Sequence, residues 1–176
     1  MARLASVASG AGQPKSPLGQ ITAQHPGLPD CGFLHLLANS PAATEGYLAC
    51  QGALAEGQLT ARQRELLALA VAEINGSKYC LAAHALLAKK AGVSADDIRF
   101  ARKATAADPQ EDAMLRFAQA VTLQRGDVSE PDFQALKRAR FSDGQIAEIV
   151  ANIALNIFTN YFNVLARTEL DVPALK

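Results

Sequence analysis

The chain has 176 residues, with 17 basic and 17 acidic side chains and a hydrophobic fraction of 49%. This length suits one ordinary domain, whose core is large enough to fold without disulfides or a structural metal. The zero net charge gives no basic surface for nucleic acid or an anionic membrane, and the longest apolar runs, 66–72 and 149–158, are shorter than the roughly 20 residues that span a bilayer.

The first 29 residues differ in composition from the rest of the chain. They contain four of the eight prolines, four of the twelve glycines and two charged side chains, Arg3 and Lys15. The prolines oppose a helix, including the helix of a mitochondrial presequence, and the apolar residues near the start are too diluted by Ser and Gly for a secretory signal. We therefore predict a flexible N-terminal arm over 1–29 and a single domain over 30–176.

From residue 30 onward the apolar residues recur with the period of an α-helix, and no stretch alternates as a strand does. Residues that favour helix starts, such as Pro41, Thr60 and Ser77, alternate with glycines that favour helix ends. The expected helices, in chain order, cover 33–39, 42–56, 62–74, 77–90, a short segment after 94, 109–124, 132–140 and 142–167. We predict an all-α helical bundle.

The last expected helix, 142–167, is apolar around most of its circumference. Such a helix is typical of a large core or a subunit interface, so we expect a homo-oligomer. Four asparagines form one stripe along it: Asn152, Asn156, Asn160 and Asn163. Two interpretations of this stripe stay open. The asparagines could simply face solvent. Alternatively, their amides could be buried, where they would fix the register between subunits or line a pocket, and Asn156 and Asn160 are the candidates for that role.

The number and spacing of the cysteines indicate the redox compartment of the protein. The chain contains three cysteines, Cys31, Cys50 and Cys80, which form an odd and sparse set without a Cys-x-x-Cys pair. The three histidines are scattered along the sequence. This pattern favours a reducing cytoplasm over a secreted disulfide framework, and it offers no zinc-site spacing. We expect a cytoplasmic protein with no metal site and no cofactor.

The segment around Cys80 is the candidate for chemistry. If Ser77 caps its helix, Cys80 lies in the first turn, where free backbone N–H groups and the positive helix end favour a thiolate. His84 follows one turn later on the same face and could act as a neighbouring base. On spacing alone, the alternative is a buried Cys80 that packs as a small apolar residue beside a core histidine.

The residues of this segment resemble a known family. The runs are Arg64-Glu65, Ala-Glu-Ile-Asn-Gly at 72–76, Tyr79-Cys80 and Ala83-His84. Together they resemble the AhpD-like alkylhydroperoxidases of the carboxymuconolactone decarboxylase superfamily, whose signature is a Glu, a Cys-x-x-Cys and a His four residues after the second Cys. The runs at 39–42 and 156–163 extend the likeness over about residues 31 to 173. It is closest to the branch called peroxidase-related proteins.

The resemblance implies a role for each matching position. Cys80 matches the peroxidatic thiol, which attacks the O–O bond of a hydroperoxide, and His84 and Glu65 match the relay that removes its proton. Tyr79 occupies the aromatic position beside the nucleophile. The resemblance also implies an all-helical fold that assembles as a trimer or hexamer, with the active site near subunit contacts.

One position departs from the family motif, because Ser77 stands where the first Cys is expected. A hydroxyl cannot condense with a sulfenic acid to form a disulfide. The resolving sulfur would have to come from Cys50, Cys31, another subunit or a small thiol. We expect Cys50, in the middle of a helix, to be buried and inert, and Ser77 to be a plain N-cap.

The favoured function is that of an antioxidant enzyme with peroxiredoxin-like activity. It would reduce an organic hydroperoxide through Cys80, with a thiol or dithiol as reductant. Two alternatives stay open. One is a lyase like carboxymuconolactone decarboxylase, for which the motif region offers only His84 and Lys78 to hold and deprotonate a carboxylate substrate. The other is a catalytically idle oligomeric scaffold.

Overall fold

A computed structural model describes residues 1–7, 16–25, 27 and 29–171. All regular structure in these residues is helical, which confirms the all-α prediction. The helices are α1 (Pro17–Gln24), α2 (Gly32–Leu37), α3 (Pro41–Ala55), α4 (Ala61–Ile74), α5 (Lys78–Lys90), α6 (Ala95–Ala101), α7 (Pro109–Gln124), α8 (Glu130–Arg138) and α9 (Asp143–Ala166). Every helix expected beyond residue 30 is present, with ends close to the predicted ones.

The N-terminal segment contains a helix that its prolines do not prevent. Pro17 lies in the first turn of α1, where its missing N–H is harmless, and Ser16 caps the helix. Leu18 and Ile21 are buried against the core. The expectation that the prolines exclude a helix is therefore wrong for α1, while part of the predicted arm, 8–15, 26 and 28, lies outside the described residues.

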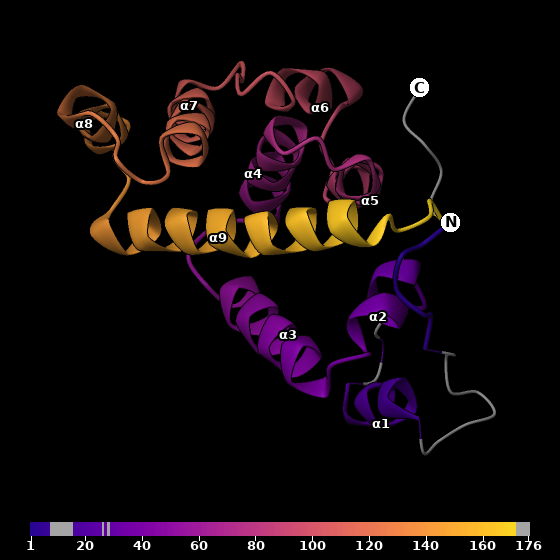
Figure 1. Cartoon of the computed structure of the whole chain (residues 1–176). Coiled ribbons are helices and arrows are strands. Elements are labelled where there is room, and N and C mark those ends of the chain that lie inside the picture. The colour runs from indigo at the N-terminus through magenta and orange to yellow at the C-terminus, as the bar shows by residue number, and fades with distance from the viewer. Residues whose placement is uncertain (8–15, 26, 28, 172–176) are drawn as a thin grey trace.

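Helix α9 crosses the whole width of the molecule, with α4 to α8 on one side and α1 to α3 on the other (Figure 1). Its Ile149 and Ile153 belong to the main core cluster together with residues of α4 and α7. By length and apolar composition alone, α9 could cross a membrane, although its longest apolar run, 149–158, is too short to do so. In this structure α9 is the central packing element of a helical bundle. The core helices of such bundles commonly have the same length and apolar composition.

The asparagine stripe of α9 is buried, so the interpretation that it faces solvent is wrong. Asn152, Asn156 and Asn163 each donate from Nδ2 to the carbonyl oxygen four residues earlier, at 2.8–2.9 Å. Asn160 instead accepts a hydrogen bond at Oδ1 from Nδ2 of Asn75, at 3.0 Å. Because Asn75 caps the C-terminal end of α4, this bond attaches α9 to the turn that leads from α4 into α5.

The turn between α4 and α5 fixes where α5 begins. Gly76 has φ of +66°, a left-handed conformation that glycine adopts without steric cost, and it reverses the chain after α4. Ser77 is buried, and its Oγ accepts a hydrogen bond from the N–H of Cys80 at 3.5 Å. Ser77 therefore caps α5, as expected, and it places Cys80 in the first turn.

Candidate active site

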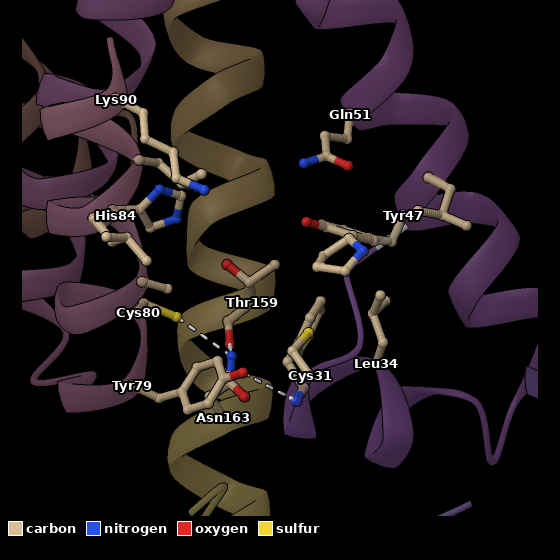
Figure 2. Close-up of a pocket in the computed structure, with 16 residues that line it drawn as sticks. Cys31, Leu34, Tyr47, Gln51, Tyr79, Cys80, His84, Lys90, Thr159 and Asn163 are labelled. Carbon is tan, nitrogen blue, oxygen red and sulfur yellow. Dashed lines mark hydrogen bonds between the residues drawn. The ribbon is translucent and has the colours of Figure 1, made fainter. Parts of the chain in front are cut away.

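A cavity of about 240 Å³ lies beside the start of α5. Its walls come from α5 and α9 on one side and from α3 and the segment around α2 on the other (Figure 2). The residues that bring polar groups to this cavity are Cys31, Tyr47, Gln51, Tyr79, Cys80, His84, Lys90, Thr159 and Asn163. The remaining lining is apolar, a combination typical of small-molecule sites.

Cys80 lines this cavity and is only 3% exposed. Its Sγ accepts a hydrogen bond from Nδ2 of Asn163, with 3.3 Å between the two atoms. The N-terminal end of α5 and this amide donor both act to stabilise negative charge on the sulfur. Cys80 thus has a polar hydrogen-bond donor and a helix N-terminus at its sulfur, in addition to the apolar neighbours of its core cluster.

The amide of Asn163 is held in one orientation. Its Nδ2 also donates to the carbonyl oxygen of Thr159 at 2.9 Å, and its Oδ1 accepts from the hydroxyl of Thr168 at 2.7 Å. Nδ2 is therefore the atom that faces the sulfur. Of the two asparagines that the sequence marked as pocket candidates, neither Asn156 nor Asn160 lines the cavity.

His84 lines the same cavity and pairs with Glu65, which does not belong to the cavity lining. The Nδ1 atom of His84 lies 2.9 Å from Oε2 of Glu65, and their side chains are 23% and 19% exposed. A carboxylate at Nδ1 fixes the tautomer and leaves Nε2 available for substrate or water. No hydrogen bond joins His84 to Cys80 in the described part of the chain, so a proton would pass between them through a bridging molecule.

Tyr79 connects α5 to the opposite wall of the cavity. Its Oη accepts a hydrogen bond from the backbone N–H of Phe33, at 3.3 Å, and the side chain is buried. Burial, reinforced by the neighbouring Cys31, raises the pKa of Tyr79 above its ordinary value. Tyr79 therefore stays neutral and acts as a wall of the cavity.

The two other cysteines have different surroundings. Cys50 is exposed on α3, because that helix buries the face of Thr44 and Leu48, so the expectation of a buried Cys50 is wrong. Cys31 lines the cavity together with Cys80, and burial raises the pKa of its thiol. Among the described residues, no group of three or more His, Cys, Asp or Glu side chains could hold a metal ion.

Known proteins resemble this chain in sequence and in fold. The model of the carboxymuconolactone decarboxylase family matches residues 41–123 of this chain, whereas no curated protein matches it.

Solved structures share the fold. One is a protein of unknown function from Agrobacterium tumefaciens, suggested to be the antioxidant defence protein AhpD. It is 27% identical to this chain, with a TM-score of 0.70, and the match covers 77% of this chain and 94% of the other. An uncharacterized peroxidase-related protein from Ralstonia eutropha JMP134, described as an alkylhydroperoxidase AhpD core, is 25% identical, with a TM-score of 0.71 over 86% and 82%. The debrominase Bmp8, solved with 2,3,4-tribromopyrrole, shares the fold at 20% identity, with a TM-score of 0.75 over 97% and 93%.

Proposed function

Because the chain belongs to the AhpD-like carboxymuconolactone decarboxylase superfamily, we propose that it is a thiol-dependent hydroperoxide reductase with Cys80 as the peroxidatic thiol. One observation carries this proposal. The sulfur of Cys80 lies in the first turn of α5, lines a cavity and accepts a hydrogen bond from Asn163. A thiol in that position is prepared to carry negative charge and to meet a small substrate.

The proposed reaction starts with attack of the Cys80 thiolate on the terminal oxygen of an organic hydroperoxide. The O–O bond breaks, an S–O bond forms, and the sulfur becomes a sulfenic acid. The alkoxide takes up a proton and leaves as the alcohol. A thiol or dithiol then returns two electrons to the sulfur, which fits a cytoplasmic protein with free cysteines.

His84 and Glu65 supply the proton transfer in this proposal. His84 accepts the thiol proton through a bridging water or the substrate, and it returns the proton to the leaving alkoxide. The carboxylate of Glu65, 2.9 Å from Nδ1, stabilises the imidazolium that exists between these two steps. Support comes from the placement of His84 at one cavity with Cys80, and from the contact that Glu65 of α4 makes with His84 from outside the cavity lining.

The cavity favours an organic hydroperoxide over hydrogen peroxide. Its walls include Phe33, Leu34, Leu48 and Leu87, which would pack against an alkyl or aryl group. Its volume of about 240 Å³ exceeds the roughly 150 Å³ of an engineered cavity that takes up benzene. Cumene hydroperoxide is therefore a suitable probe of the substrate class.

We also propose that the chain forms a homo-oligomer, a trimer or hexamer. Exposed apolar residues recur at spacings of three and four along α9. They include Val150, Phe158, Tyr161 and Leu165, of which the last two are each 60% exposed. A second copy covering this face would remove a continuous apolar stripe from water. Sedimentation of the wild type and of Tyr161→Glu tests this, and a monomeric wild type would contradict it.

Turnover of cumene hydroperoxide with dithiothreitol as donor tests the enzymatic proposal. We expect the wild type to consume the peroxide, Cys80→Ser to lose turnover, and Cys50→Ser to retain it, because Cys50 is exposed and does not line the cavity. Turnover that survives in Cys80→Ser would overturn the proposal. Conversion of a lactone acid that is independent of Cys80 would favour the lyase instead, and an unreactive Cys80 would favour the scaffold.

A further inference from the structure

We propose that Cys31 is the resolving thiol that condenses with the sulfenic acid of Cys80. The inference rests on the proposed function, because it requires oxidation of Cys80 by a hydroperoxide. A resolving thiol is needed from another part of the chain, since the motif position that would hold one is Ser77, which caps α5 and carries no sulfur.

The structure brings Cys31 and Cys80 to one cavity from separate elements. Cys31 immediately precedes α2, whereas Cys80 lies in the first turn of α5. Both line the cavity, and Figure 2 shows them on opposite walls. Both also pack in the same apolar cluster, which includes Phe33 and Tyr79. The 48 residues between them in the sequence therefore do not separate them in space.

Tyr47 lines the same cavity as the two cysteines. Its ring packs edge-on against Phe33, the second residue after Cys31, at a centroid distance of 5.1 Å. Burial raises the pKa of Tyr47, so its hydroxyl stays neutral beside the two thiols.

The thiol of Cys31 is accessible, because Cys31 is partly exposed, as access to a reductant requires. Burial raises the pKa of this thiol, and hydrogen bonds with the backbone of Leu34 and the side chain of Tyr79 act in the opposite direction. A disulfide needs Cβ atoms about 3.5–4.5 Å apart, so α2 must approach α5 when the bond forms. Helix α2 is a short element outside the main core cluster, so its movement would leave that cluster intact and would require the contact of Phe33 with Phe162 of α9 to adjust.

The remaining thiol of the chain does not meet these conditions. Cys50 is exposed on α3 and does not line the cavity. The sequence contains three cysteines in all. Cys31 is therefore the single thiol of the same chain that shares a cavity with Cys80, and Cys50 serves as a matched control.

The chemistry of this step balances with the reactants already proposed. The sulfur of Cys31 attacks the sulfur of the Cys80 sulfenic acid, an S–S bond forms, and the S–O bond breaks. The hydroxide that leaves combines with the proton of Cys31 and departs as water. An external dithiol then reduces the Cys31–Cys80 disulfide and becomes a disulfide itself. Over one cycle, hydroperoxide and dithiol yield alcohol, water and the oxidised dithiol.

The test is mass spectrometry of the protein after one equivalent of cumene hydroperoxide, alkylation of the remaining thiols and digestion without reduction. We expect a peptide pair joined through Cys31 and Cys80 in the wild type and in Cys50→Ser. In Cys31→Ser and Cys31→Ala we expect no such pair, and dimedone should trap about tenfold or more sulfenic acid on Cys80. Circular dichroism of both variants checks that they are folded.

Each outcome separates the inference from the proposed function. Equal sulfenic acid on Cys80 in the wild type and in Cys31→Ser, without a linked peptide, would overturn the role of Cys31 and leave the peroxidase proposal intact. A linked peptide found only in covalent dimers on a non-reducing gel would also overturn it, because the resolving thiol would then belong to another subunit. A Cys80 that is never oxidised in any variant would overturn both proposals.

Discussion

Asn163 donates a hydrogen bond from Nδ2 to the sulfur of Cys80, at 3.3 Å and across 83 residues of sequence. The amide cannot present its oxygen to the sulfur without losing the hydrogen bond from Thr168. The last helix of the chain therefore contributes directly to a site whose remaining polar residues, among them His84, come from α5, from α3 and from the start of α2.

Replacing Asn163 with Ala should slow oxidation of Cys80 by cumene hydroperoxide by about 10- to 100-fold. A hydrogen bond to a charged group contributes about 1.5–3 kcal/mol, and this one would stabilise the thiolate. The rate of thiol loss, followed by stopped flow, measures the effect. Asn152→Ala is the matched control, because that buried asparagine makes the same bond to the carbonyl four residues earlier without touching Cys80. Equal rates for the two variants would contradict a role for the contact.

Replacing Glu65 with Gln should lower kcat/KM for the hydroperoxide by about 100-fold, within the range for a positioned acid–base group. An amide can still hold Nδ1 of His84, but it cannot stabilise the imidazolium. Glu45→Gln is the control, because its Oε2 lies 3.1 Å from Nε2 of His25 in a second Glu–His pair outside the cavity lining. The account is wrong if both variants lose activity equally.

The Ser77→Cys variant should restore the two-cysteine motif and change the route of resolution. We expect a disulfide between position 77 and Cys80 after oxidation, since the two residues lie in one turn at the start of α5. Loss of the serine cap should cost about 1 kcal/mol of folding stability. In this background Cys31→Ser should no longer increase sulfenic acid on Cys80. A continued need for Cys31 would show that the motif geometry here does not support the shorter route.

Arg62 should matter for stability and not for catalysis. Its guanidinium bonds Glu111 of α7 at 2.8 and 2.9 Å and lies 3.1 Å from Asp97 of α6. Arg62→Ala leaves the largely buried Glu111 carboxylate without its partner, so we expect the free energy of unfolding to fall by about 2 kcal/mol. Urea denaturation measures this, with Arg116→Ala as the exposed control, expected to cost about 0.5 kcal/mol or less. Equal losses would show that the bond does not hold α4 to α7.

The residues of the α4–α5 segment could be predicted from sequence because local geometry decides their positions. A serine cap and a spacing of four bring Ser77, Cys80 and His84 to one end and one face of a single helix. Glu65 joins them because α4 and α5 pack as neighbours across a short turn. The recurrence of apolar residues with the period of an α-helix was likewise enough to predict the all-α fold class.

Tertiary packing decided the features that the sequence did not predict. Spacing marked four asparagines on α9, but only the way α9 packs on α5 determines that Asn163 meets the sulfur. The Ala-rich α3 gave no clear polar face, so the exposure of Cys50 could not be inferred. Pro17 was counted against a helix, whereas it occupies the one turn of α1 where proline is tolerated.

The most direct test of the central claim is to identify the first oxidised atom. The protein is mixed with substoichiometric cumene hydroperoxide and dimedone, and the adduct is located by mass spectrometry at early times. We predict that dimedone labels Cys80 before any other cysteine, and that Cys80→Ala shows no early adduct elsewhere. Early labelling of the exposed Cys50 with an intact Cys80 thiol would contradict the account.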